Sequence, residues 1–386
     1  MNQELTYWVA LTHTPKIRTS RKNEMIVHCF NEGKTIVDFL ESDNFLGMDL
    51  KQEEIALLSQ TKSELGNYSF MVEELLDQGY EIIPITSKDY SPVLKSNLKY
   101  SSPLVLYTKG NKQILQEKSI AIVGSRNANE NALLFTDNIA KKASSEYKVV
   151  VSGFAKGVDK QALDSALKYK GQSIIVLPQG ISTFGSGMKK YYKQIIAGDV
   201  LVLSTFHPKS PWSVELAMAR NAIIYGLASE IFAAQSDDKG GTWAGVCDGL
   251  KKGRTVYVRL PNDKENCANK SLIEKGAIAV DMEGRTLYSN VLESIEEEMP
   301  SSIVAEAPAS YMSIDERIQE LLTKGEYSTR QIVDLLQLKG ISSRQLTQRL
   351  SKMKDIQINR KGRVNMYSLN ASQKPEQLSL DIAFAN

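Results

Sequence analysis

Two apolar runs that each break at a Gly/Ser turn place the strongest constraint on this chain. The runs are SIAIV at 119–123 and KVVV at 148–151, and the turns after them are GSR at 124–126 and SGFAKGVD at 152–159. Each turn precedes a helix-like segment, so the sequence predicts two successive strand–turn–helix units. A helix that begins at such a turn has backbone N–H groups without helical acceptors, and these attract phosphate oxygens. We therefore expect a phosphate-binding crevice at the carboxyl edge of a parallel sheet.

The two turns contribute charge as well as backbone amides. Arg126 lies in the first turn and Lys156 in the second. Asp159 ends the second turn, where a carboxylate can cap the helix or brace the loop, so we assign it a structural role. The residues of these turns expected to contact phosphate are Gly124, Ser125, Arg126, Ser152, Gly153, Lys156 and Gly157. The alternative for each turn is a tight strand-to-helix connection without a ligand.

Arg220 and Asn221 interrupt a mostly apolar helical segment at 217–228. A charged residue buried without a partner is costly. We therefore expect either a structural ion pair for Arg220 or a contact of both residues with phosphate or base at the mouth of the crevice.

Two further segments have the composition of phosphate or nucleic-acid contacts. The KGGT sequence resembles a glycine-rich anion loop that opens a helix, with a surface turn as the alternative. Lysines interleaved with two tyrosines suit single-stranded nucleic acid, with a solvated helix face as the alternative. The candidate contacts in these segments are Gly240, Gly241, Thr242, Lys189 and Lys190.

The apolar pattern divides the chain into five parts. Residues 1–80 have helical spacing, and 81–292 form the core. Within the core, 81–118 are transitional and 119–280 alternate short apolar runs with helix-length segments, which is typical of a doubly wound parallel sheet. An acidic, Pro-containing linker follows at 293–312. Residues 313–370 have the pattern of three helices and a hairpin, the winged form of helix-turn-helix, which binds either DNA or protein. Residues 371–386 are expected to be a flexible tail.

Composition excludes several classes of protein. The net charge is +2, so any basic surface is local. Three scattered cysteines fit a reducing cytoplasm. With only three histidines, the sequence offers few residues for a histidine-based metal site or catalytic triad. The chain begins without the pattern of a signal peptide and contains no apolar stretch long enough for a membrane helix. We expect a cytoplasmic protein without metal, cofactor or catalytic residues.

With these residues described, the chain resembles the DprA/Smf family of DNA-processing proteins. The resemblance runs from about residue 70 to 370, and its strongest motifs are IAIVGSR, VVVSGFAKGVD, SIIVLPQGI and AMARNAIIYGLA. It implies a helical, SAM-like N-terminal domain, an extended Rossmann-like core and a C-terminal winged helix. It also implies a homodimer that binds and protects single-stranded DNA and helps to load a RecA-type recombinase during DNA uptake and recombination.

The chain departs from the family pattern at several positions, which keeps other functions open. Leu163 occupies a position where the family has histidine, and Ala222 replaces the second arginine of an RNR motif. One alternative is an enzyme similar to the nucleoside-monophosphate phosphoribohydrolases, which share GGT loops. Those enzymes have a glutamate shortly after the loop, whereas the first acid here is Asp248. A third hypothesis is a nucleotide-sensing defence module that signals through the winged helix.

The tail contains EQLSLDI at 376–382, which resembles the peptides with which bacterial repair proteins bind the sliding clamp. Leu378 and Leu380 form an apolar pair that nothing local can bury, and Gln377 lies beside them. The sliding clamp is therefore a candidate partner, with an unstructured end as the alternative.

Overall fold

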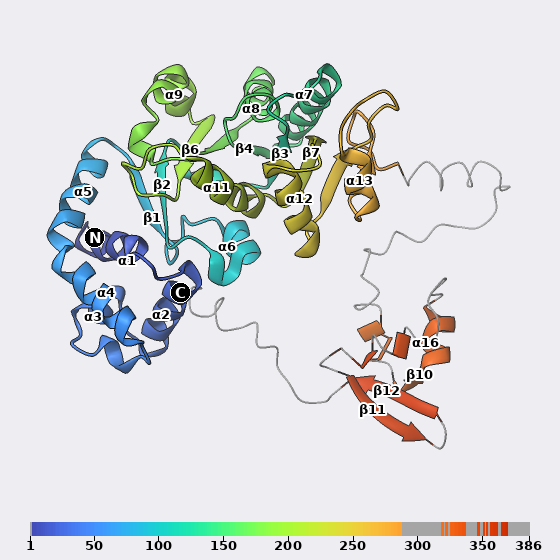
Figure 1. Ribbon diagram of the computed structural model, residues 1–386, viewed down its shortest axis with the longest axis horizontal. Coiled ribbons are helices and arrows are strands. Elements are labelled where there is room, and N and C mark those ends of the chain that lie inside the picture. The colour runs from blue at the N-terminus through green and yellow to red at the C-terminus, as the bar shows by residue number, and fades with distance from the viewer. Residues whose placement is uncertain are drawn as a thin grey trace. The chain divides into compact units, whose positions relative to one another are not determined.

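The computed structural model describes residues 2–287 and, farther along the chain, 318–319, 321–322, 325–336, 346–347, 350–351, 353, 356–361 and 364–369. Within these residues the chain forms two compact units, one in Met1–Glu298 and the other in Met299–Asp381 (Figure 1).

The first unit is built on a nine-stranded, mostly parallel sheet, as the sequence predicts. In sheet order the strands are β1-β2-β6-β5-β4-β3-β7-β8-β9, and the antiparallel pairs are β1 with β2 and β2 with β6. The bounds are β1 Glu81–Pro84, β2 Val105–Lys109, β3 Ser119–Gly124, β4 Val149–Ser152, β5 Ser173–Val176, β6 Val200–Ser204, β7 Glu230–Gln235, β8 Val256–Arg259 and β9 Ile278–Val280.

The strand order reverses once, between β3 and β7. In the parallel part of the sheet, the chain runs from β3 through β4 and β5 to β6 on one side, and then returns to place β7, β8 and β9 on the other side. β3 and β7 are hydrogen-bonded neighbours, with Ala121 opposite Ile231. The connections that leave these two strands diverge to opposite sides, so a crevice forms outside their carboxyl ends.

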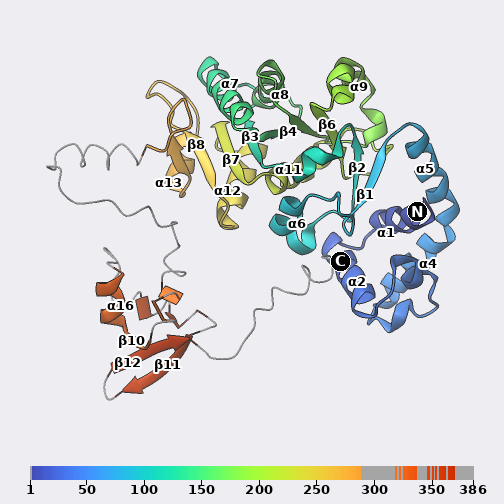
Figure 2. The ribbon, with the colours of Figure 1, turned by 180° about the vertical axis from the view of Figure 1, so that it is seen from behind.

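Helices cover both faces of the sheet because strand side chains alternate between the faces. Ile120, Ile122 and Phe232 pack under α7 (Glu130–Ser145) and α8 (Val158–Lys168). Ala121 and Ile231 point to the opposite face, which α11 (Val214–Leu227) and α12 (Gly241–Lys251) cover (Figure 1, Figure 2). The remaining helices around the sheet are α6 Pro92–Leu98, α9 Gly185–Lys190, α10 Tyr192–Ala197 and α13 Asn269–Glu274, with 3-10 turns η2 Lys99–Ser101, η3 Lys112–Gln116 and η4 Ile181–Thr183.

Helices occupy most of the segment before the sheet. They are α1 Asn2–His13, α2 Thr19–Asn31, α3 Ile36–Glu41, α4 Gln52–Ser63 and α5 Leu65–Asp77, with the 3-10 turn η1 Phe45–Gly47. Their apolar side chains, such as Trp8 and Leu58, belong to the same buried cluster as Val105 and Leu106 of β2. These helices therefore share a core with the antiparallel edge of the sheet.

A polar cluster also joins α1 to the sheet. His13 Nε2 and the Tyr107 hydroxyl share a hydrogen bond of 2.7 Å, and the His13 ring lies edge-on to the ring of His207, with centroids 5.0 Å apart. Nearby, the Lys22 ammonium donates to the carbonyls of Thr12 and Thr14. Burial, together with the positive charge that His207 and Lys22 can carry, lowers the pKa of His13 to about 3.

This depressed pKa makes part of the stability pH-dependent. As pH falls below about 6.5, the unfolded chain binds a proton at His13 that the folded protein does not bind until pH approaches 3, so stability is lost across that window. Between pH 7 and pH 5 we expect this group to remove about 2 kcal/mol of the free energy of unfolding. Urea titrations at both pH values should show a smaller loss for His13→Gln; equal losses would contradict this assignment.

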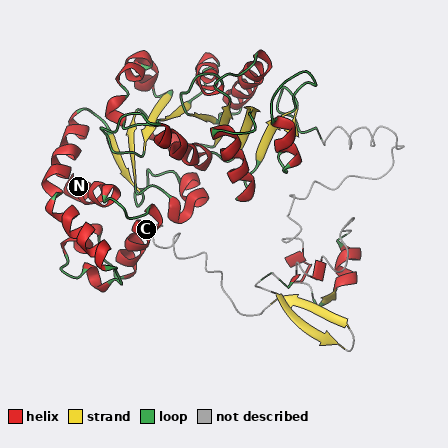
Figure 3. Ribbon diagram, viewed as in Figure 1, coloured by secondary structure: helices red, strands yellow, loops and turns green. Residues whose placement is uncertain are grey.

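The second unit contains a small antiparallel sheet in the order β10-β12-β11. Its two longer strands are drawn in yellow in Figure 3. Its strands are β10 Tyr327–Ser328, β11 Ile356–Lys361 and β12 Val364–Leu369, and α16 spans Thr329–Leu335. β11 and β12 confirm the predicted hairpin. The first and third predicted helices fall largely outside the described residues, so the winged helix stays a prediction. The linker at 293–312 and the tail at 371–386 also lie outside them.

Candidate nucleic-acid interface

A hollow opens where the sheet topology predicts it, outside the carboxyl ends of β3 and β7. It brings together four of the segments singled out in the sequence: both Gly/Ser turns, the start of α12 and the middle of α11. Candidate residues that line it are Gly124, Ser125, Arg126, Asp159, Arg220, Asn221, Gly240, Gly241 and Thr242. Asp237 and Lys239, from the loop that precedes α12, line it as well. We call this the first hollow.

The two Gly/Ser turns are in direct contact. Gly157 has a φ of +77°, and a Cβ atom there would collide with the backbone carbonyls of Ser125 and Arg126. The Val158 amide donates to the Ser125 carbonyl over 3.4 Å, while the Ser125 amide donates to the Gln235 carbonyl over 2.9 Å. Only glycine at position 157 lets the second turn approach the first so closely.

Several groups expected to contact phosphate already have partners within the protein. Ser152 is buried, and its hydroxyl lies 3.2 Å from the Asp159 carbonyl, to which it donates. The backbone of Gly153 and Ala155 donates to the Asp159 carboxylate. Burial raises the pKa of Asp159, and Arg220 together with these hydrogen bonds opposes that shift. Asp159 thus braces the second turn and occupies the start of α8.

Arg220 lies at the floor of the hollow with unsatisfied donors. The residue is only 4% exposed, and its Nη1 lies 3.6 Å from Oδ2 of Asp159. Its Nε and Nη1 have no hydrogen-bond partner among the residues that the structure describes. Burial lowers the pKa of Arg220, and Asp159 opposes the shift. A guanidinium held in this way favours an additional acceptor, because unmet buried donors carry a large desolvation penalty.

The backbone of Gly153 makes room for this guanidinium. A Cβ atom on Gly153 would overlap the Arg220 side chain. The small residue in the second turn and the charged residue in α11 are therefore complementary.

The N-terminus of α12 supplies a second positive feature. Gly240 precedes the helix with a φ of +93°, no side chain caps the first turn, and that turn contains no acid. The first amides of an uncapped helix are natural donors to an anion. α8 differs, because Asp159 lies in its first turn. The α12 end is thus the better anion site of the two helices that start at the hollow.

A second hollow adjoins the first. Arg126, Ala155, Ala217 and Arg220 line both hollows. The second is completed by Gly153, Phe154, Lys156, Pro178, Gln179, Phe184 and Trp212. The sequence analysis missed Phe154 and Trp212; the signal for Trp212 was an aromatic residue in a Pro-flanked segment outside any apolar run.

The Lys189–Lys190 segment is not brought to either hollow. Both lysines are exposed at the end of α9, and the Lys190 ammonium lies 5.0 Å from the centroid of the Tyr191 ring. Tyr191 is buried and donates its hydroxyl to Asp164 over 2.9 Å, so its ring is not free to stack on a base.

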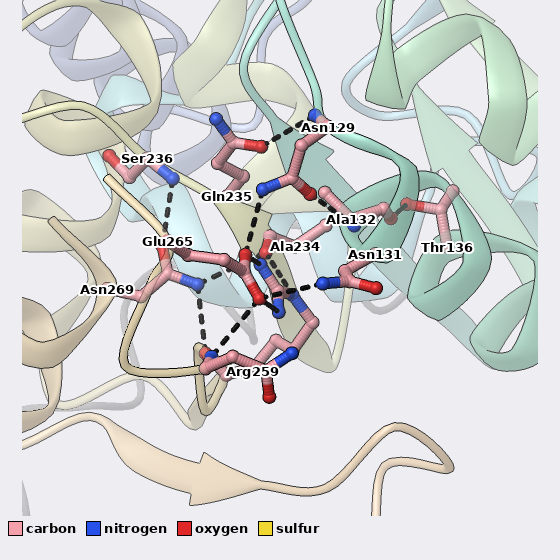
Figure 4. Close-up of polar contacts among 11 residues, drawn as sticks. Asn129, Asn131, Ala132, Thr136, Ala234, Gln235, Ser236, Arg259, Glu265 and Asn269 are labelled. Carbon is pink, nitrogen blue, oxygen red and sulfur yellow. Dashed lines mark hydrogen bonds and ion pairs between the residues drawn. The ribbon is translucent and has the colours of Figure 1, made fainter. Parts of the chain in front are cut away.

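A buried polar network is connected to the first turn by hydrogen bonds (Figure 4). Arg259 is 1% exposed, and its guanidinium donates to both carboxylate oxygens of Glu265 over 3.0 and 2.5 Å. Asn129 and Asn131 donate their side-chain amides to the same carboxylate. These hydrogen bonds, that from Arg259 foremost, lower the pKa of Glu265 to about 2.

The network reaches the first turn through Gln235. The Gln235 side-chain oxygen accepts a hydrogen bond from the backbone amide of Asn129. The backbone carbonyl of Gln235 accepts one from the backbone amide of Ser125. Arg259 and Glu265 thus hold the ends of β7 and β8 against the start of α7. Sequence reasoning missed this pair because the loop that carries Glu265 has no regular pattern.

The described residues contain no cluster of His, Cys, Asp or Glu that could hold a metal ion. Among the described helices, none is both long and apolar enough to span a membrane.

Comparison with known proteins identifies the family. Residues 81–291, more than half of the chain, match the family model of DNA recombination-mediator protein A. The chain belongs to this family. The resemblance to DprA/Smf proteins expected from the two Gly/Ser turns is thereby confirmed.

Individual relatives agree with the family match. The chain is 31% identical to DNA processing protein DprA of Bacillus subtilis over 209 residues, which cover 53% of this chain and 69% of the relative. It is 31% identical to DprA of Streptococcus pneumoniae over 160 residues, 41% of this chain and only 56% of the relative. The X-ray structure of the pneumococcal DprA superposes with a TM-score of 0.52 at 25% identity, covering 72% of this chain and 98% of that one.

Proposed function

We propose that this protein is a recombination mediator that binds and protects single-stranded DNA through the two adjoining hollows. The observation that carries the proposal is Arg220, a buried arginine with two donors that no described residue accepts. It lies in a crevice that Arg126 and the uncapped start of α12 also line. The family match to DNA recombination-mediator proteins supports the same role.

The depth of Arg220 favours a single strand over a duplex. Because the residue is only 4% exposed, a phosphate must enter the hollow to reach its donors. One flexible strand can place a phosphate there, whereas a duplex presents its phosphates on a stiff, wide cylinder.

We further propose that the protein is not an enzyme and needs no cofactor. The acids that line the first hollow are Asp159 and Asp237. Asp159 is engaged by Arg220 and by two backbone groups, so it is a poor general base for hydrolysing a glycosidic bond. A competition assay with free nucleotides against a bound single strand distinguishes these hypotheses. The enzyme and the nucleotide-sensing module must both bind a mononucleotide, whereas the proposed function does not require it.

The remaining parts of the proposal have other grounds than the two hollows. The family resemblance implies a homodimer and transfer of the strand to a RecA-type recombinase. The scattered cysteines favour a cytoplasmic location, and the likeness of residues 376–382 to clamp-binding peptides makes the sliding clamp a candidate partner of the tail.

The double substitution Arg126→Ala with Lys156→Ala tests the proposed site. Both side chains are exposed at the hollows, so their loss should not unfold the protein. We expect affinity for an oligo-dT strand to fall roughly tenfold or more, because two charge-assisted contacts are lost. The slope of log affinity against log salt should decrease by about 1.4, or about 0.7 for each phosphate contact.

Lys189→Ala with Lys190→Ala is a control matched in charge, since these lysines line neither hollow. It should leave both quantities close to those of the unmodified protein. Unchanged affinity and slope in the Arg126/Lys156 variant would rule out the hollows as the DNA site.

A further inference from the structure

We infer that the second hollow is a binding subsite for an unstacked nucleobase, and that Trp212 is the side chain on which the base stacks. The inference rests on the proposed function and extends it from the phosphates of the strand to its bases.

The second hollow has the walls that a nucleobase requires. Phe154, Phe184, Pro178 and Trp212 line it, so much of its surface is aromatic or apolar. Trp212 is 50% exposed, and Val214 and Met218, which line the first hollow, are exposed beside it at the start of α11. A base has apolar faces and polar edges, and stacking on an aromatic side chain tolerates any base.

One wall of the second hollow, at Phe154, is held by ring contacts. The Phe154 ring packs edge-on against Phe184 and Tyr191, with centroids 5.1 and 5.7 Å apart. Its backbone has a φ of +60°, a conformation that non-glycine residues adopt only when their surroundings hold them there. Phe154 therefore cannot swing into the hollow to cover Trp212 without losing both ring contacts.

The segment that carries Trp212 is also held in place. Lys209 forms an ion pair of 2.7 Å with Glu74 of α5, and the Ser210 and Pro208 carbonyls accept backbone hydrogen bonds from Gly180 and Ser182. An aromatic ring presented on a fixed segment pays little ordering entropy when a ligand binds.

The two hollows match the two parts of a nucleotide. Arg126, Ala155, Ala217 and Arg220 belong to both, so the phosphate donors lie directly beside the aromatic hollow. A strand with a phosphate at Arg126 and Arg220 would bring a neighbouring base to Trp212. Duplex DNA cannot do so, because its bases are paired and stacked inside the helix.

The test compares an oligo-dT strand with an abasic strand of the same length and the same number of phosphates. The unmodified protein should bind the strand with bases more tightly, by roughly 5- to 150-fold for one stacked base. Trp212→Ala should bind both strands alike, with the salt slope of the unmodified protein because no phosphate contact is lost. Trp212→Phe should retain most of the preference.

Fluorescence provides an independent measurement. Trp8 is buried and Trp243 is partly buried, so Trp243→Phe leaves Trp212 as the exposed indole. Its emission should be quenched by the strand with bases and much less by the abasic strand.

The outcomes separate this inference from the proposed function. If Trp212→Ala keeps the full preference for bases, or the emission is quenched equally by both strands, the subsite is wrong while strand binding stands. If the unmodified protein binds neither strand, the proposed function fails and the subsite fails with it. Equal thermal unfolding midpoints of the Trp212 variants and the unmodified protein exclude misfolding as the cause.

Discussion

Glu265→Ala is expected to lower the free energy of unfolding by about 3–5 kcal/mol, since it leaves a buried arginine without its counter-charge. Arg259 is almost inaccessible to water, and the Glu265 carboxylate accepts hydrogen bonds from both terminal nitrogens of Arg259. The substitution also removes the acceptor of the Asn129 and Asn131 side chains. Urea unfolding at neutral pH measures the loss.

Asp263→Asn in the same loop is the matched control. Asp263 pairs with Lys270 over 2.8 Å, but its side chain is almost fully exposed, and exposed pairs contribute little to stability. A loss for Glu265→Ala as small as that for Asp263→Asn would contradict the view that the buried network holds the ends of β7 and β8.

The network should also make stability sensitive to acid. The pKa of Glu265 is lowered to about 2, so its contribution is present above the ordinary glutamate pKa and disappears as pH falls from about 4.5 towards 2.

Gly157→Ala is expected to destabilise the protein by about 2–5 kcal/mol and to weaken strand binding as well. An alanine at a φ of +77° costs about 1–2 kcal/mol by itself. The new Cβ would also collide with the carbonyls of Ser125 and Arg126, and relieving such overpacking costs about 1–3 kcal/mol more. The two turns must move apart, which displaces Arg126 from Arg220.

Gly253→Ala separates the two contributions. Gly253 has a φ of +68°, close to that of Gly157, but nothing lies within 4 Å of a Cβ atom built there. This variant should lose only about 1–2 kcal/mol and should bind single strands normally. If the two variants lose the same stability and affinity, the close contact between the turns has no energetic importance.

The local pattern of the sequence was enough to predict the parallel core. Apolar runs of strand length, each ending at a turn residue and followed by a helix, recur from 119 onward, and the structure has strands at each of them. The reason is that strand and helix periodicity and turn chemistry are properties of neighbouring residues. The same local signals located the two Gly/Ser turns and the glycine-rich start of α12.

The partners of each candidate site residue come from distant parts of the chain. Only the tertiary structure therefore decided which groups each of these residues contacts. Sequence alone left Arg220 open between an ion pair and a phosphate contact. Folding brings Asp159 to 3.6 Å from it and leaves two of its donors without a hydrogen-bond acceptor among the described residues.

The same holds for where the other candidate residues lie. Folding uses the Ser125 amide to join β7 and carries Lys189 and Lys190 away from the hollows, but places Trp212 inside one. Sequence determines which residues can bind phosphate. The order of strands in the sheet decides which of them meet, because long-range pairing sets the distances between their side chains.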